Sequence, residues 1–149
     1  MIKRLLIILI LGIILPPSLT GQPYEHAAGV RAGYSSGLTY KGFLRYRMSA
    51  FQLDAYYNRH GFNLSLQYLY HMEPFRNNRW LVFAGGGPFS GQWDDAFSAG
   101  LLLTGGIEYV MRDLPLNFGF NWRPLLNIYR ESAYDLLDFG LSVRYRFSL

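Results

Sequence analysis

The chain has 149 residues, of which half are hydrophobic and 17% aromatic, and its formal net charge is only +4. This length suits one domain, and so much apolar side chain excludes a disordered, solvating protein. Because the chain has no cysteine, disulfides, thiolate metal ligands and a cysteine nucleophile are excluded as well.

The N-terminus has the pattern of a secretory signal peptide. A basic pair, Lys3 and Arg4, precedes an apolar run over 5–15, and two prolines follow that run. The run is shorter than the roughly 20 apolar residues of a spanning helix, so we predict cleavage near Gly21, with an uncleaved membrane anchor as the alternative. Loss of Lys3 and Arg4 takes the formal charge from +4 to +2, which gives a nucleic-acid partner no electrostatic footprint. We therefore predict a signal peptide over 1–21 and a single domain over 22–149.

In the mature chain, apolar and polar residues alternate in segment after segment, as in β-strands with one apolar face. The clearest segment runs from Phe62 to Met72, where every second residue is apolar or aromatic. We predict eight strands over 27–35, 38–46, 50–58, 62–72, 79–90, 97–111, 116–129 and 136–147. The turns between them are predicted at Ser36–Gly37, 47–49, 59–61, 73–78, 91–96, 112–115 and 129–135.

Eight strands with short connections predict an up-and-down meander. Residues 28–46 could also form one long strand broken at Gly37, but an odd count would place the termini at opposite ends, which single-chain bacterial barrels avoid. In a soluble barrel the apolar face would point inward, yet eight strands enclose too little space for so many aromatic rings. We therefore predict an all-β, eight-stranded, antiparallel, up-and-down transmembrane β-barrel, with lipid outside and polar side chains inside.

The alternation also assigns the charged residues of the strands to the lumen. Buried charges need partners, because an unpaired one costs several kcal/mol. We predict a polar network in the lumen that consists of Arg31, Lys41, Arg45, Asp54, Glu108, Arg123, Asp138, Arg144 and Arg146. Within it, we expect Arg144 and Arg146 to pair with carboxylates on neighbouring strands. The same alternation points further polar side chains inward, namely Gln52, Gln67, His71 and Asn121.

Two interpretations of this lumen are open. Its side chains either fill the barrel and hold it together, as expected for eight strands, or line a narrow basic conduit. The glycine-rich stretch 85–91 lacks the Gly-Lys-Ser/Thr sequence and the helix of a phosphate loop, so it indicates close packing. For hydrolysis, the only arrangement at a rim would join His60 with Asp94 or Asp95. We expect no catalytic residue, no metal site and no cofactor.

The end of the chain carries a family likeness. The sequence Asp138-x-Gly140-x-x-Val143-x-Tyr145-x-Phe147 resembles the signal by which outer-membrane β-barrels are recognised for insertion. The stretches 36–44 and 105–128 resemble a family of small secreted barrels of Gram-negative bacteria, often called porin-like and mostly uncharacterised. The resemblance implies location in the cell outer membrane, contact with its lipid and lipopolysaccharide, and assembly by the barrel insertion machinery. It implies an insertion signal made of Gly140, Val143, Tyr145 and Phe147.

We therefore expect an outer-membrane barrel with a structural or membrane-integrity role and a lumen filled by polar side chains. The alternatives are a narrow porin-like conduit for small or apolar solutes and, third, an outer-membrane hydrolase. With both termini in the periplasm, the turns at 47–49, 73–78 and 112–115 face the periplasm. The outer turns are short for a barrel that grips a partner through its loops. The sequence predicts no oligomeric state.

Overall fold

The computed structural model describes residues 24–44, 48–59, 61–75, 79–93, 96–128 and 133–147. Among these residues, no helix is long and apolar enough to cross a membrane. The predicted signal peptide over 1–21 lies outside the described residues. The ordered elements are all strands: β1 His26–Gly33, β2 Ser36–Phe43, β3 Ser49–Asn58, β4 Gly61–Met72, β5 Trp80–Trp93, β6 Ala96–Val110, β7 Leu116–Trp122, β8 Leu125–Asn127, β9 Ala133–Asp135 and β10 Phe139–Phe147.

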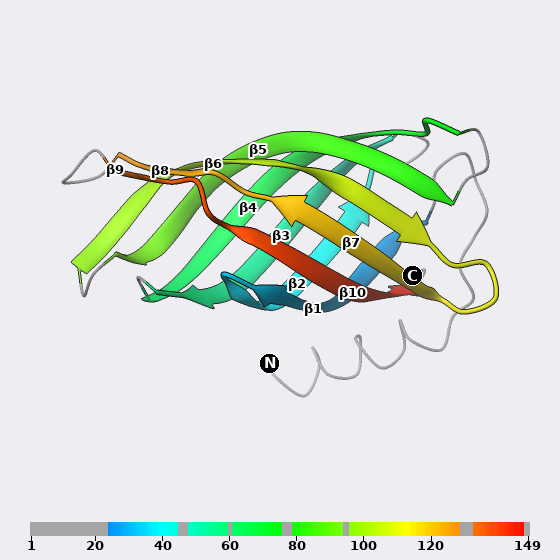
Figure 1. Ribbon diagram of the computed structural model, residues 1–149, viewed down its shortest axis with the longest axis horizontal. Coiled ribbons are helices and arrows are strands. Elements are labelled where there is room, and N and C mark those ends of the chain that lie inside the picture. The colour runs from blue at the N-terminus through cyan, green and yellow to red at the C-terminus, as the bar shows by residue number, and fades with distance from the viewer. Residues whose placement is uncertain are drawn as a thin grey trace.

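The strands form one antiparallel sheet that closes on itself (Figure 1). From β1 to β7 each strand pairs with the next along the chain, and β10 pairs with both β7 and β1. β7 and β8 both pair with β6, so they are two parts of one barrel strand. β9 and β10 are likewise two parts of the last strand, because β9 pairs with β8 and β10 with β7. The predicted all-β, eight-stranded antiparallel barrel is therefore confirmed.

The first turn differs from the prediction. It lies at Tyr34 and Ser35, whereas the prediction put it at Ser36–Gly37, and both of those residues belong to β2. The reason is a pair of hydrogen bonds from Arg31, whose Nη1 donates to the Ser35 carbonyl oxygen at 2.7 Å and to its hydroxyl at 2.6 Å. These bonds hold the turn over the lumen and bury Ser35 completely.

The last two strands differ from the prediction. The predicted strand 116–129 is interrupted, and β9 lies within the predicted turn 129–135, so the last barrel strand begins before 136 and is interrupted at 136–138. The seventh breaks at Arg123 and Pro124, because proline has no N–H to donate to a ladder. The backbone N–H of Arg123 donates instead to the Asp138 carbonyl oxygen at 2.9 Å. Residues 136–138 accordingly separate β9 from β10, so the two interruptions lie beside each other in the wall.

Side chains alternate between the lumen and the outer wall along every strand. On β4, Ser65, Gln67 and Leu69 are buried, while the exposed fractions of Leu64 and Leu66 are 53% and 45%. The charged residues follow the same rule without exception in the described strands. All seven are buried: Arg31, Lys41, Asp54, Glu108, Asp135, Arg144 and Arg146. The barrel thus has a charged interior and an outer wall with no acidic or basic residue on these strands.

A glycine at the closing seam provides a test of this architecture. Gly29 of β1 lies opposite Arg144 of β10, and a Cβ at this position would lie 1.9 Å from the Val143 carbonyl oxygen. We expect Gly29→Val to lower the free energy of unfolding by about 1–3 kcal/mol, because β1 and β10 must move apart to admit the side chain. Guanidinium unfolding of the purified protein measures the change.

The matched control is Ala28→Val, which adds similar volume at the neighbouring position that points away from the lumen. This change should leave the free energy of unfolding within about 0.5 kcal/mol of the unsubstituted value. Equal unfolding midpoints for Gly29→Val and Ala28→Val would contradict the close approach of β1 and β10.

Candidate functional site

The lumen is the candidate functional site, because it holds the buried polar side chains of the barrel. Its ion pairs fall into two clusters. We call the first the arginine cluster, which consists of Arg31, Ser35, Asp54, Arg123 and Asp138. We call the second the lysine cluster, which consists of Tyr24, Lys41, His71, Glu108 and Asn117.

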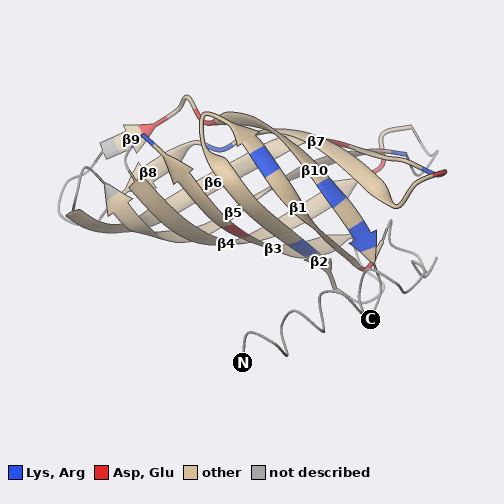
Figure 2. Cartoon of the chain, turned by 90° about the horizontal axis from the view of Figure 1, so that it is seen from below, with Lys and Arg blue, Asp and Glu red and all other residues tan. Residues whose placement is uncertain are grey.

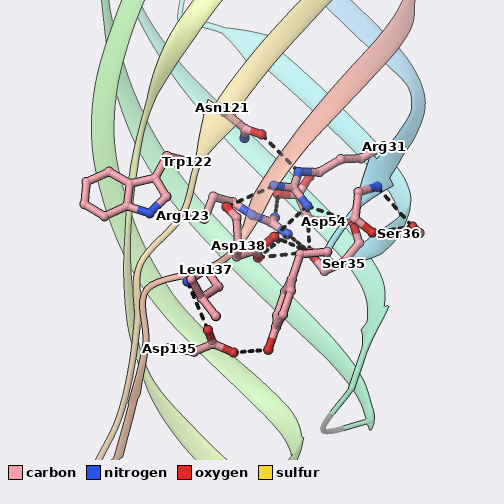
Figure 3. A network of polar contacts seen from close by, with 12 residues as sticks. Arg31, Ser35, Ser36, Asp54, Asn121, Trp122, Arg123, Asp135, Leu137 and Asp138 are labelled. Atoms are coloured by element: carbon pink, nitrogen blue, oxygen red, sulfur yellow. Dashed lines mark hydrogen bonds and ion pairs between the residues drawn. The ribbon is translucent and has the colours of Figure 1, made fainter.

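The arginine cluster joins four distant parts of the chain (Figure 3). Asp138 accepts from Arg31 Nη1 at 2.9 Å and from Arg123 Nη2 at 3.2 Å. The other terminal nitrogen of Arg123 donates to Asp54 Oδ2 at 2.7 Å. The Ser35 hydroxyl accepts from both guanidinium groups and lies 2.9 Å from both Asp138 oxygens. β1, the first turn, β3 and the two interrupted strands therefore meet at one set of charges.

The irregular backbone places two of these head groups. Arg123 lies at the break between β7 and β8, and Asp138 immediately precedes β10. The bond from the Arg123 backbone to the Asp138 carbonyl fixes the two segments side by side. On the outer side, the Trp122 indole donates to the Leu136 carbonyl oxygen at 2.7 Å. These two hydrogen bonds thus join the segments at the point where the regular ladder is interrupted.

Glutamines extend the cluster toward the middle of the lumen. Besides Arg123, Asp54 Oδ2 accepts from Gln52 Nε2 at 2.9 Å and from Gln67 Nε2 at 2.6 Å. The hydroxyl of Thr104 donates to the Gln67 side-chain oxygen. Because these groups are at most 3% exposed, they exchange hydrogen bonds with one another in place of water.

The lysine cluster surrounds a single carboxylate. Glu108 Oε2 accepts from Lys41 Nζ at 2.8 Å, and Oε1 accepts from Tyr24 and Asn117, each at 2.5 Å. Lys41 Nζ also lies 3.1 Å from Nε2 of His71. All five residues are 0% exposed. A lysine, a histidine and a glutamate in contact could serve acid–base chemistry, and here all three are completely buried.

The prediction that Arg144 and Arg146 pair with carboxylates is wrong. Arg144 donates to the Thr39 hydroxyl at 3.1 Å and to Gln52 Oε1 at 3.2 Å. Arg146 donates to the carbonyl oxygens of Met111 and Leu114 in the turn that precedes β7. Within the described part of the chain, the ion pairs use Asp54, Glu108 and Asp138 for other cations, so neutral oxygens hold these two arginines.

The lumen is also more apolar than predicted. At the end where β1 begins and β10 ends, which we call the terminal end, a buried cluster closes the interior; it comprises Tyr24, Ala27, Phe43, Ala50, Leu81 and Val110. A second buried cluster, Phe89, Leu102 and Leu125, lies toward the opposite end. The alternation contained a signal for Phe89 and Leu102, since both have inward positions. It contained none for Tyr24, which precedes the first predicted strand.

At the opposite end, Tyr34 of the first turn contacts β9. Its hydroxyl donates to Asp135 Oδ2 at 2.5 Å. Partial burial and the neighbouring Asp135 charge raise the pKa of Tyr34 to about 12. The phenol therefore stays protonated, and remains a donor, throughout the neutral pH range.

The structure places the remaining predicted residues as follows. Gly140 faces the lumen, where a Cβ would lie 2.5 Å from the Arg31 guanidinium carbon. Val143 is exposed on the outer wall, Tyr145 is half-buried, and Phe147 is 6% exposed. Several predicted positions lie outside the described residues: Arg45, His60, Asp94 and Asp95. In the described ranges, no three His, Asp or Glu residues are grouped so that they could hold a metal ion.

Comparison of the chain with protein-family models, with curated proteins and with solved structures gave no match. The function must therefore be inferred from the barrel itself.

Replacement of one carboxylate tests whether the arginine cluster holds the barrel together. Asp138→Ala leaves the buried guanidinium groups of Arg31 and Arg123 short of their shared anion. We expect a loss of about 3–5 kcal/mol in the free energy of unfolding, the usual cost of removing one partner from a buried ion pair. The same substitution at the exposed Asp113, in the turn before β7, should change it by less than about 0.5 kcal/mol. Denaturant unfolding that is equal for both variants would rule out a stabilising role for the cluster.

Proposed function

We propose that the protein is an integral outer-membrane β-barrel with a structural, membrane-integrity role and a lumen that does not conduct. The observation that carries this proposal is the distribution of charge. Every charged residue of the described strands is buried, while many large apolar residues on the outer wall are 39–73% exposed. A continuous exposed apolar wall is rare in soluble proteins and is expected where lipid is the solvent.

The composition of the outer wall supports this placement. Aliphatic side chains on it come from strands all around the barrel: Val30, Leu38, Leu53, Leu64, Leu101 and Leu141. Several aromatic rings lie near strand ends, where membrane barrels carry interfacial girdles; they include Tyr70, Trp80 and Tyr109 at the terminal end and Tyr57 and Phe62 at the other. Figure 2 shows that acidic and basic residues occupy only short segments of the strands, and the side chains at these positions are buried.

The filled lumen favours the structural role over the conduit. The arginine and lysine clusters consist of paired or hydrogen-bonded groups that are almost completely buried, and an apolar cluster follows the lysine cluster at the terminal end. A conducting pore needs polar groups that remain accessible to water along its length. The hydrolase alternative has no support in the described residues, since His60, Asp94 and Asp95 lie outside them.

Conductance distinguishes the structural barrel from the conduit. Purified protein added to planar bilayers should produce no current steps at any salt concentration, because side chains occupy the lumen. Insertion is verified in the same preparation by a change of electrophoretic mobility on heating. Reproducible anion-selective steps from the inserted protein would contradict the structural role and support the conduit.

A charge on the outer wall tests the membrane location. We expect Leu141→Arg to weaken insertion by about 2–4 kcal/mol if this position lies near the bilayer midplane, because the guanidinium would face hydrocarbon. The yield of folded protein in vesicles of bacterial phospholipid measures the effect. Leu114→Arg, the same change in the exposed turn before β7, should insert normally. A soluble protein would tolerate both substitutions and would remain in solution without detergent.

A further inference from the structure

Arg144 of β10 is a buried cation that contacts no carboxylate directly. Its side chain is 1% exposed, and it donates to the neutral oxygens of Thr39 and Gln52. Its terminal nitrogen Nη1 is buried and has no hydrogen-bond partner within the described part of the chain. Burial of a charged group is costly when its donors lack acceptors. The protein groups around Arg144 therefore satisfy this guanidinium only in part.

The charges of the described lumen residues do not balance around Arg144. In the arginine cluster, two carboxylates face two guanidinium groups. In the lysine cluster, Glu108 is the single carboxylate, and its Oε2 accepts from Lys41 at 2.8 Å. Arg144 adds a positive charge to an interior whose carboxylates already have partners. Arg146 lacks a carboxylate as well, but it lies at the terminal end, is 8% exposed and donates to carbonyl oxygens.

The space beside Arg144 Nη1 lies over Gly119 of β7. Gly119 is buried on the lumen face, and its partner on β10 is Ser142. A Cβ built on Gly119 would lie 2.6 Å from Ser142 Oγ and 3.5 Å from Arg144 Nη1. The next atom, the Ile107 carbonyl oxygen, would be 3.8 Å away. A hydroxyl and an unpartnered guanidinium nitrogen thus lie beside the same point.

Two other inward glycines of the barrel are more crowded than Gly119. A Cβ at Gly140 would meet three guanidinium atoms of Arg31 within 2.8 Å. At Gly106 it would lie 2.3 Å from the Phe120 carbonyl oxygen and 2.8 Å from the Phe83 ring. At Gly119 no backbone atom comes as close, and the nearest groups are the ends of two polar side chains.

The chemistry of this space favours a small anion. Both neighbouring side chains can donate a hydrogen bond, and the bond from a guanidinium is strengthened when its acceptor is charged. Glu108, the partner of Gly119 on β6, directs its carboxylate to Lys41, Tyr24 and Asn117, which occupy its oxygens. One excess positive charge calls for a monovalent ion. Space the size of one side-chain carbon favours a single atom such as chloride over sulfate or phosphate.

We propose that the lumen binds one chloride-sized monovalent anion beside Gly119, held by Arg144 Nη1 and the Ser142 hydroxyl. The ion supplies the negative charge that Arg144 lacks, so it stabilises the folded barrel together with the arginine and lysine clusters. Because the site lies inside the barrel, the inference goes beyond the proposed membrane-integrity role. It does not depend on what the outer wall contacts.

The dependence of folding on chloride tests the site. The purified full-length protein is unfolded and refolded in urea in detergent micelles, while gluconate replaces chloride at constant ionic strength. An ion that binds only the folded state raises the equilibrium constant for folding. At chloride concentrations above the dissociation constant, each tenfold rise in chloride should raise that constant nearly tenfold. Tryptophan fluorescence measures the shift of the unfolding midpoint.

Three substitutions make the test specific. Gly119→Ala places a methyl group in the proposed site and should abolish the chloride dependence. Arg144→Gln removes the positive charge and should abolish it as well. The matched control, Gly105→Ala, adds a methyl group on the outward face of β6, where the Phe83 carbonyl oxygen would be 3.9 Å away, and should retain the dependence. The measured quantity is the slope against chloride, so a variant of lower stability remains informative.

Bromide locates the ion directly. In crystals grown with bromide in place of chloride, an anomalous diffraction peak is expected beside Arg144 Nη1 and Ser142 Oγ. The same peak should be missing from crystals of Gly119→Ala.

Three outcomes would overturn the proposal. A folding equilibrium constant that does not change with chloride would reject the anion. It would fit a water molecule between Arg144 Nη1 and the Asn117 amide oxygen, which also lacks a hydrogen-bond partner among the described residues. An unchanged chloride dependence in Gly119→Ala would place the ion elsewhere. An equal effect of sulfate at the same ionic strength would show general stabilisation by salt. Each of these results would leave the proposed membrane location standing.

Discussion

The bridge from Asp54 through Arg123 and Asp138 to Arg31 is the interaction on which the rest of this barrel depends. It connects β1, β3 and both interrupted strands across a lumen from which water is largely excluded. Burial of a guanidinium carries a large desolvation cost, and the carboxylates of Asp54 and Asp138 offset this cost for Arg31 and Arg123. The turn at Ser35 and the break at Arg123 and Pro124 each bring a polar group to the bridge. The irregularities of the wall therefore position groups of the interior.

The charged interior also accounts for the outer wall. Alternate residues of a strand lie on opposite faces of the sheet. Because the charged residues of these strands face the lumen, the aliphatic and aromatic residues that alternate with them face outward. The lysine cluster and the apolar cluster beside it fill the terminal half of the lumen in the same way that the arginine cluster fills the rest. In the proposed membrane location, this apolar exterior meets lipid.

Much of this structure could be predicted from the sequence, because strand alternation assigns faces without any knowledge of the fold. Arg31, Lys41, Asp54, Glu108 and Arg144 lie in the lumen as their positions require. The partners could not be predicted. Which carboxylate meets which cation depends on how the strands stagger around the barrel, and Arg144 meets Thr39 and Gln52 as a result. Tyr24 and Ser35 were missed because they lie outside the strands, where alternation carries no information.

The most direct test of the account is a cysteine scan of β4, which is feasible because the chain has no cysteine of its own. Single cysteines from Ser65 to Leu69 carry a fluorophore in phospholipid vesicles, and a nitroxide in the lipid acyl chains quenches it. The account predicts strong quenching at Leu66 and Tyr68 and weak quenching at Ser65, Gln67 and Leu69, with period two. Quenching of all five positions by a water-soluble agent, and of none by the lipid nitroxide, would contradict it.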